Sequence, residues 1–189
     1  GETRGLMGIQ IDNLVKINKK YGSLKGDETL RNLVYVLNQT KSELTLLFKQ
    51  NGPGIFIYKQ SARDEEIKDF ITRLNKNIAD SDIFVEPVTL AISIVRIDEL
   101  NPEFPTRDRV NQLIELTLTR LERAKQKGNG QVLDKETDIN TYTEGIILLV
   151  DEDETYQNLM GKIFKRINYD VIIAKDIYEA QEILENKKI

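Results

Sequence analysis

The 189-residue chain contains no cysteine and no histidine. These absences exclude disulfide bonds, thiolate nucleophiles, Cys/His zinc sites, Ser-His-Asp triads and histidine general bases. Any metal ion must then be held by oxygen ligands, which favours Mg²⁺ or Ca²⁺. The lack of cysteine also fits a reducing compartment, so we expect a cytoplasmic protein.

Two features that would indicate particular partners are also missing. With 27 basic and 31 acidic residues, the net charge is -4, so neither a nucleic-acid-binding surface nor a polybasic membrane patch is visible. No apolar run approaches the roughly 18 residues of a membrane-spanning helix. We therefore expect no nucleic acid and no membrane among the partners of this segment.

Charge is distributed unevenly along the chain. Residues 144–189 carry six basic and ten acidic side chains, which leaves 21 of each sign in residues 1–143. Residues 134–144 are polar and have no apolar period, as is typical of a linker. The sequence therefore predicts two domains, residues 1–133 and 145–189, joined by residues 134–144.

Apolar periodicity predicts a mixed α/β (α+β) fold for the first domain. Strands are expected at residues 5–12, 44–50, 54–58, 88–97 and 131–133, and helices after residue 13 and at about 27–37, 63–78 and 107–127. Asp12 and Asn13 are expected to cap the first helix and Gly22 to end it. This order indicates a sheet with flanking helices, in a ferredoxin- or cyclase-like arrangement.

The second domain is expected to form a partial flavodoxin-like βαβα unit. Its apolar run at residues 146–150 is typical of a buried parallel strand, and acidic residues follow the run directly. A helix is expected at about 155–167, a strand at 169–174 and a helix at 177–186.

Three motifs in the first domain resemble those of a known family: IDNLVKINKKYGSLKGDETL, VTLAISI and LERAKQKGNGQV. They are similar, in this order, to motifs of the GGDEF domain, the catalytic module of diguanylate cyclases. The resemblance spans roughly residues 5–133 and implies a nucleotide-cyclase-like fold. It also implies a dimer in which each subunit binds one GTP, and divalent metal on the triphosphate during synthesis of cyclic di-GMP.

The same resemblance implies that the metal-binding carboxylates of the family are replaced. Gln10 stands at the first aspartate of the family's D-x-D motif, and a neutral amide is a poor ligand for a hard cation. The segment matching G-G-D-E-F reads Asn51, Gly52, Pro53, Gly54 and Ile55, so proline replaces the second metal ligand. Lys125 matches a phosphate-binding lysine, whereas Asn129 replaces an arginine. We therefore predict no metal site in this domain and no enzymatic activity.

The guanine-binding residues of the family match Asn18 and Asp27. An aspartate accepts hydrogen bonds from guanine N1–H and N2–H, and an asparagine side chain both donates and accepts. Together with Lys125 they would form a retained GTP site. In the alternative interpretation, Asp27 caps the N-terminus of its helix and Asn18 closes the helix before it.

The second domain resembles the opening of a response-regulator receiver domain. The resemblance implies that Asp151 and Glu152 match the acidic pair that helps to hold Mg²⁺ after the first strand. The alternative is a solvated acidic loop.

Taken together, these patterns favour a non-catalytic GGDEF-type regulatory or dimerisation module in bacterial cyclic di-GMP or two-component signalling. Its partner would be another protein or a second copy of the chain. A GTP-sensing module is the alternative, because Asn18 and Asp27 are retained, and an active diguanylate cyclase is the least favoured hypothesis.

Overall fold

The computed structural model describes residues 4–49, 52, 54–138, 145–166 and 169–186. The chain divides into two compact units, Gly1–Asp138 and Ile139–Ile189, which we describe separately. Among the described residues, the first unit contains a five-stranded sheet and the second a two-stranded sheet.

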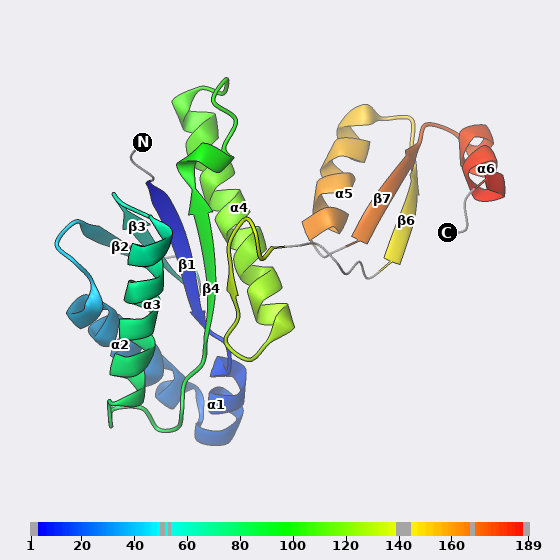
Figure 1. Ribbon diagram of the computed structural model, residues 1–189. Helices are drawn as coiled ribbons and strands as arrows, with labels where there is room; N and C mark the ends of the chain where they lie inside the picture. The colour runs from blue at the N-terminus through cyan, green and yellow to red at the C-terminus, as the bar shows by residue number, and fades with distance from the viewer. Residues whose placement is uncertain (1–3, 50–51, 53, 139–144, 167–168, 187–189) are drawn as a thin grey trace. The chain divides into compact units, whose positions relative to one another are not determined.

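The central strand of the first sheet is β1 (Gly5–Ile11), as Figure 1 shows. β3 (Ile55–Lys59) and β4 (Leu90–Arg96) pair with it in antiparallel fashion on either side. β2 (Thr45–Lys49) extends the sheet beyond β3, and β5 (Val132–Leu133) pairs with β4 in parallel. The order is therefore β2-β3-β1-β4-β5, and the expected α/β class, with a sheet and flanking helices, is confirmed.

Both faces of this sheet are covered by helices, because alternate residues of its strands point to opposite faces. α1 (Leu14–Tyr21), α2 (Ser23–Thr40) and α3 (Asp64–Ala79) share one apolar core with Met7, Ile9 and Ile11 of β1. α4 (Thr106–Lys127) packs on the other face, where its apolar residues meet Leu6 and Val95. The fold thus holds β1 between two layers of helices (Figure 1).

α2 begins at Ser23, earlier than the expected start near Asp27. Asp27 consequently lies inside the helix, and the interpretation of this residue as a helix cap is wrong. Glycine is unfavourable in a helix interior by about 1 kcal/mol, yet Gly26 lies within α2. The tertiary contact at Gly26, described below, explains why that position is nevertheless helical.

The segment between β1 and α1 is tied to the start of β4. The Asp12 backbone N–H donates to Thr89 O at 2.8 Å. The Asn13 side chain donates to Pro87 O at 2.9 Å and accepts from the Thr89 N–H at 3.2 Å. Asn13 makes no side-chain capping hydrogen bond to α1, so that expectation is wrong, whereas Gly22 ends α1 as predicted.

The first unit continues beyond residue 133 to Asp138, through residues that the sequence assigned to a linker. The Asp138 carboxylate accepts hydrogen bonds from Arg120 Nε at 3.1 Å and from Arg123 Nη1 at 2.6 Å, both on α4. Residues 139–144 lie outside the described part of the chain.

The second unit has the predicted βαβα order. β6 (Gly145–Val150) and β7 (Tyr169–Ala174) are parallel, and α5 (Glu154–Arg166) and α6 (Ile177–Asn186) follow them in turn. Asp153 Oδ1 caps α5 by accepting from the Thr155 N–H, and Asp176 Oδ1 accepts from the Tyr178 N–H at the start of α6. Within the described residues of both units, no helix is long and apolar enough to cross a membrane.

Candidate functional site

Asn18 and Asp27, the predicted guanine contacts, are brought together by the packing of α1 on α2. The Asn18 side chain lies directly over Gly26, where a Cβ atom would overlap its Oδ1 and lie 2.8 Å from its Cγ. Asp27 is the next residue of α2 and is exposed. The absence of a side chain at Gly26 is thus what places the Asn18 amide beside Asp27.

Among the described residues, none competes for the polar groups of Asn18 and Asp27. Within the described part of the chain, no hydrogen bond or ion pair engages the Asp27 carboxylate or the Asn18 side chain. Asn18 contributes to the end of α1 only through its backbone oxygen, which accepts from the Gly22 N–H at 2.9 Å. The interpretation of the Asn18 side chain as a helix-closing group therefore finds no support in the geometry.

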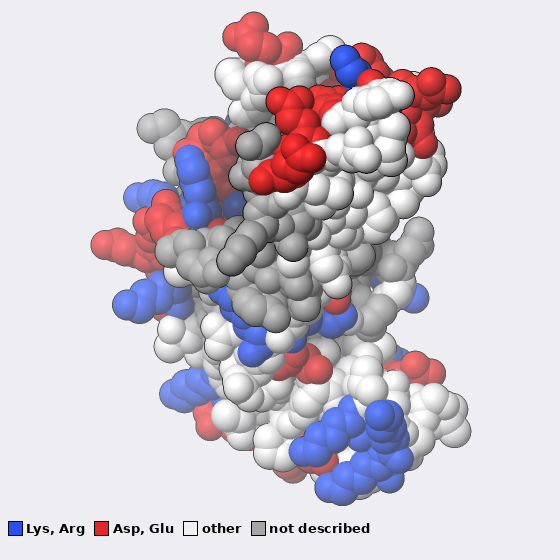
Figure 2. Space-filling view, turned by 90° about the vertical axis from the view of Figure 1, so that its right-hand side faces the viewer, with Lys and Arg blue, Asp and Glu red and all other residues white. Residues whose placement is uncertain are grey.

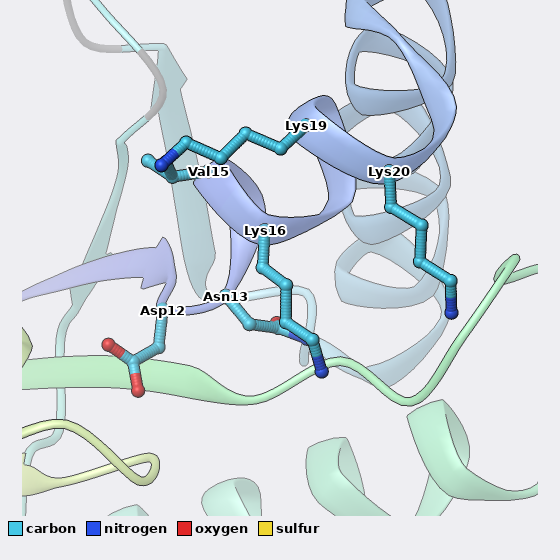
Figure 3. Close-up of a pocket in the computed structure, with 6 residues that line it drawn as sticks. All are labelled: Asp12, Asn13, Val15, Lys16, Lys19 and Lys20. Atoms are coloured by element: carbon cyan, nitrogen blue, oxygen red, sulfur yellow. The ribbon is translucent and has the colours of Figure 1, made fainter.

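A hollow of about 560 Å³ lies on α1, the helix that carries Asn18, and on the segment before it. Its lining is shown in Figure 3 and consists of Asp12, Asn13, Val15, Lys16, Lys19 and Lys20. Figure 2 shows Lys and Arg side chains gathered at the lower end of the view, the end at which Figure 1 places α1. The hollow is therefore rich in positive charge.

Two of these lysines are engaged by one carboxylate from a distant part of the chain. Lys20 Nζ lies 3.1 Å from Glu86 Oε2, and Lys16 Nζ lies 3.7 Å from Glu86 Oε1. The Glu86 side chain is only 10% exposed. The hydrogen bond from Lys20 holds the pKa of the Glu86 carboxyl below the usual 4.5 of glutamate.

Lys125 and Asn129 lie at the end of α4 and in the turn that follows it. Lys125 Nζ pairs with Glu122 of the same helix at 3.1 Å. Asn129 has a left-handed backbone conformation with φ 58°, between two glycines that also have positive φ. Gly130 donates its backbone N–H to Asp12 Oδ2 at 3.2 Å, so this turn is attached to the end of β1.

The expectation that the first domain holds no metal ion stays a prediction. Gln10 is half-buried on β1 opposite Ala91, and Asp12 already accepts a hydrogen bond from Gly130. Gly52, Gly54 and Ile55 are described, but Asn51 and Pro53 lie outside the described residues. Among the residues that the structure describes, no three acidic side chains form a group that could hold a metal ion.

In the second unit, Asp151 and Glu152 follow β6 as predicted, at the carboxyl end of two parallel strands. Asp151 Oδ1 accepts the Asp153 backbone N–H at 2.8 Å, which forms the turn into α5, and Glu152 is exposed. Their role as a receiver-type Mg²⁺ pair stays a prediction.

The sequence interpretation did not identify the lysine cluster or Glu86. The lysines were visible in the string KINKK, since residues three and four apart lie on one helix face. Glu86 carries no such signal, because its sequence separation from Lys20 is 66 residues and only tertiary packing joins them.

Comparison with known proteins identifies the first unit. A sequence model of the family described as "Diguanylate cyclase, GGDEF domain" matches residues 1–131. No curated protein with a similar sequence was found.

Solved structures agree with the family match. The GGDEF domain of PA1120 (TpbB or YfiN) from Pseudomonas aeruginosa is 18% identical with a TM-score of 0.60, over 74% of this chain and 79% of that one. The active GGEEF domain of a diguanylate cyclase from Vibrio cholerae is 18% identical with a TM-score of 0.55, over 70% and 83%. The diguanylate cyclase SiaD, in complex with its activator SiaC from Pseudomonas aeruginosa, is 14% identical with a TM-score of 0.53, over 71% and 50%. At these identities the likeness shows the fold alone.

These matches contradict the prediction that the first domain is not an enzyme. The matched family is described as that of diguanylate cyclases, and one of the similar structures is an active domain. The prediction equated replaced ligands at Gln10 and Pro53 with lost activity, although a different set of groups in the same fold can support the same chemistry.

Proposed function

The chain belongs to the GGDEF family of cyclic di-GMP signalling, and on that premise we propose that residues 1–138 form a cytoplasmic guanine-nucleotide-binding domain. In this proposal Asn18 and Asp27 hold the base, and Lys125 together with the positively charged hollow on α1 is available to the phosphates. The proposed ligand is GTP.

The observation that carries the proposal is the arrangement of Asn18 over Gly26, directly beside Asp27. An exposed carboxylate and a side-chain amide, neither of them paired within the described chain, offer both acceptors and a donor. Guanine presents N1–H and N2–H donors next to its O6 acceptor, which is the complementary set. Asp27 lies inside α2 and does not cap the helix, and no hydrogen bond or ion pair of the described residues engages its carboxylate, so the carboxylate is available to a ligand.

We further propose that the domain works with a protein partner or a second copy of the chain, and that residues 145–189 are the first part of a receiver domain. The parallel β6–β7 pair, with α5 and α6, supports the second suggestion. For the first, the diguanylate cyclase SiaD in complex with its activator SiaC offers a precedent in that protein.

The test is a calorimetric titration of the full chain with GTP, with and without Mg²⁺, alongside Asp27→Ala. Micromolar binding by the unmodified chain that is lost in the variant would support the proposal. Glu65→Ala is the matched control, because it removes the same charge from an exposed position of α3. No heat up to millimolar GTP would refute the proposal.

The same samples should be incubated with GTP and Mg²⁺ and analysed for cyclic di-GMP by chromatography. Product formed by the unmodified chain and lost in Asp27→Ala would make GTP a substrate and extend the proposal to synthesis. Binding without product would leave GTP as a ligand under those conditions. Product formation that Asp27→Ala leaves unchanged would refute the assignment of the base contacts.

A further inference from the structure

The lysine-lined hollow on α1 suggests how the phosphates are bound. We propose that Lys19 contacts the phosphates of the bound nucleotide, and that Glu86 withholds Lys16 and Lys20 from them. Glu86 would thereby limit the affinity for polyphosphates. This inference rests on the proposed guanine-nucleotide function and adds the residues that bind and regulate its anionic part.

The helix geometry connects the hollow to the proposed base site. Val15 lines the hollow and lies three residues before Asn18 and four before Lys19. Residues at these spacings are neighbours on a helix surface, so Val15 adjoins both. In Figure 3, Lys19 extends across Val15, whereas Lys16 and Lys20 extend toward the segment that leads into β4. A nucleotide with its base at Asn18 would meet Lys19 first.

The distribution of charge distinguishes Lys19 from its neighbours. Lys16 and Lys20 both pair with Glu86, and Lys125 pairs with Glu122. Lys19 has no ion-pair partner within the described part of the chain. Among the described residues that line the hollow, Asp12 is the acidic one, and its Oδ2 accepts a hydrogen bond from the Gly130 N–H. Lys19 is therefore the cation of the hollow that an incoming phosphate meets without competition.

Glu86 is placed to compete with a phosphate for the other two lysines. Its side chain is only 10% exposed, and Oε1 accepts no hydrogen bond from the described residues. If Lys16 and Lys20 moved away, the Glu86 carboxylate would lose the two ion pairs that offset its negative charge. A buried charge without a partner is unfavourable. Lys16 and Lys20 consequently remain with Glu86, and removal of the Glu86 charge should release both ammonium groups to the hollow.

The ligand chemistry that fits this arrangement is a nucleoside polyphosphate. A base site without charge compensation would bind a nucleoside and a nucleotide equally, whereas an unpaired lysine favours the charged ligand. Inorganic triphosphate shares the anionic chemistry but lacks the base, so it separates the two contributions.

The experiment is a calorimetric titration of the full chain, without divalent cations, using guanosine, GTP and inorganic triphosphate as probes. Lys19→Gln should lower the affinity for GTP about fivefold, as expected for the loss of one exposed charged contact. The affinity for guanosine should stay unchanged. Glu86→Gln should raise the affinity for GTP by about the same factor. Lys68→Gln on α3 is the control, because it removes the same charge at an exposed position outside the hollow.

The outcomes separate this inference from the proposed function. If Asp27→Ala abolishes GTP binding while Lys19→Gln leaves the affinity unchanged, the inference fails and the function stands. If circular dichroism shows that Glu86→Gln is folded but its affinity for GTP is equal to or lower than that of the unmodified chain, the proposed role of Glu86 is overturned. If only inorganic triphosphate binds, and Lys19→Gln weakens it, the lysine contact stands and the guanine function fails. If none of the probes binds, both are refuted.

Discussion

Replacement of Arg120 by methionine should strongly destabilise the first unit, because this arginine lies at the centre of a buried ion-pair network. The side chains of Arg120, Glu99 and Asp138 are only 5%, 6% and 6% exposed. Arg120 Nη2 donates to Glu99 Oε2 at 2.9 Å, Nε donates to Asp138 Oδ2 at 3.1 Å, and Nη1 donates to the Ile94 backbone oxygen. One side chain thus joins α4, the turn after β4 and the residues after β5.

The magnitude follows from what the substitution leaves behind. Methionine fills much of the space of the arginine stem, so the main loss is electrostatic. Glu99 loses its cation, and Asp138 keeps only Arg123 at 2.6 Å. Removing one partner from a buried pair costs about 3–5 kcal/mol, which corresponds to a fall in melting temperature of roughly 10–15 °C at this size.

The assay is urea unfolding of the full chain at neutral pH, followed by circular dichroism, with hydrogen exchange to assign the loss to the first unit. Arg73→Met is the control. It removes an ion pair with Asp69 that is half-exposed or more on both sides and one hydrogen bond to the Thr40 backbone oxygen at 3.2 Å, which together should contribute less than about 2 kcal/mol. Arg120→Met/Glu99→Gln should recover part of the loss, because it removes the carboxylate that the first change left unpaired. A loss in Arg120→Met no larger than that in Arg73→Met would refute the reasoning.

Two further predictions concern the candidate site. Gly26→Ala should displace Asn18 and destabilise the first unit by about 1–3 kcal/mol, despite the better helix propensity of alanine. Gly161→Ala in α5 should instead stabilise by about 0.5–1 kcal/mol, because the added Cβ would meet no atom within 4 Å beyond its own stretch of helix. Equal effects of the two changes in urea unfolding would exclude the close contact at Gly26. The contribution of Glu86 to stability should be present above pH 4.5 and disappear as the pH falls through its depressed pKa, because the folded state then binds the proton less readily than the unfolded state. Unfolding curves of the unmodified chain and Glu86→Gln should therefore differ at neutral pH and converge in acid, and a difference that grew on acidification would contradict this sign.

Much of the fold is encoded in local patterns that can be read without a structure. The alternation of apolar residues at Val88, Leu90, Ile92 and Ile94 predicted β4. The glycines at positions 22 and 128 predicted where α1 and α4 end. These signals are local because strand and helix periods repeat within a few residues. The start of α2 was placed near Asp27, whereas the helix begins at Ser23 and includes Gly26, against which the Asn18 side chain packs.

The sequence by itself determined the class of the fold, the order of the elements and the motifs that resemble the GGDEF family. Only the tertiary structure decided which polar groups meet: Asn18 with Gly26 and Asp27, Glu86 with Lys16 and Lys20, and Asp138 with Arg120. The physical reason is that periodicity reports burial and local backbone geometry, whereas charge pairing depends on distances between segments that lie far apart in the sequence. The lysines were visible in the sequence, but the carboxylate that holds two of them was not.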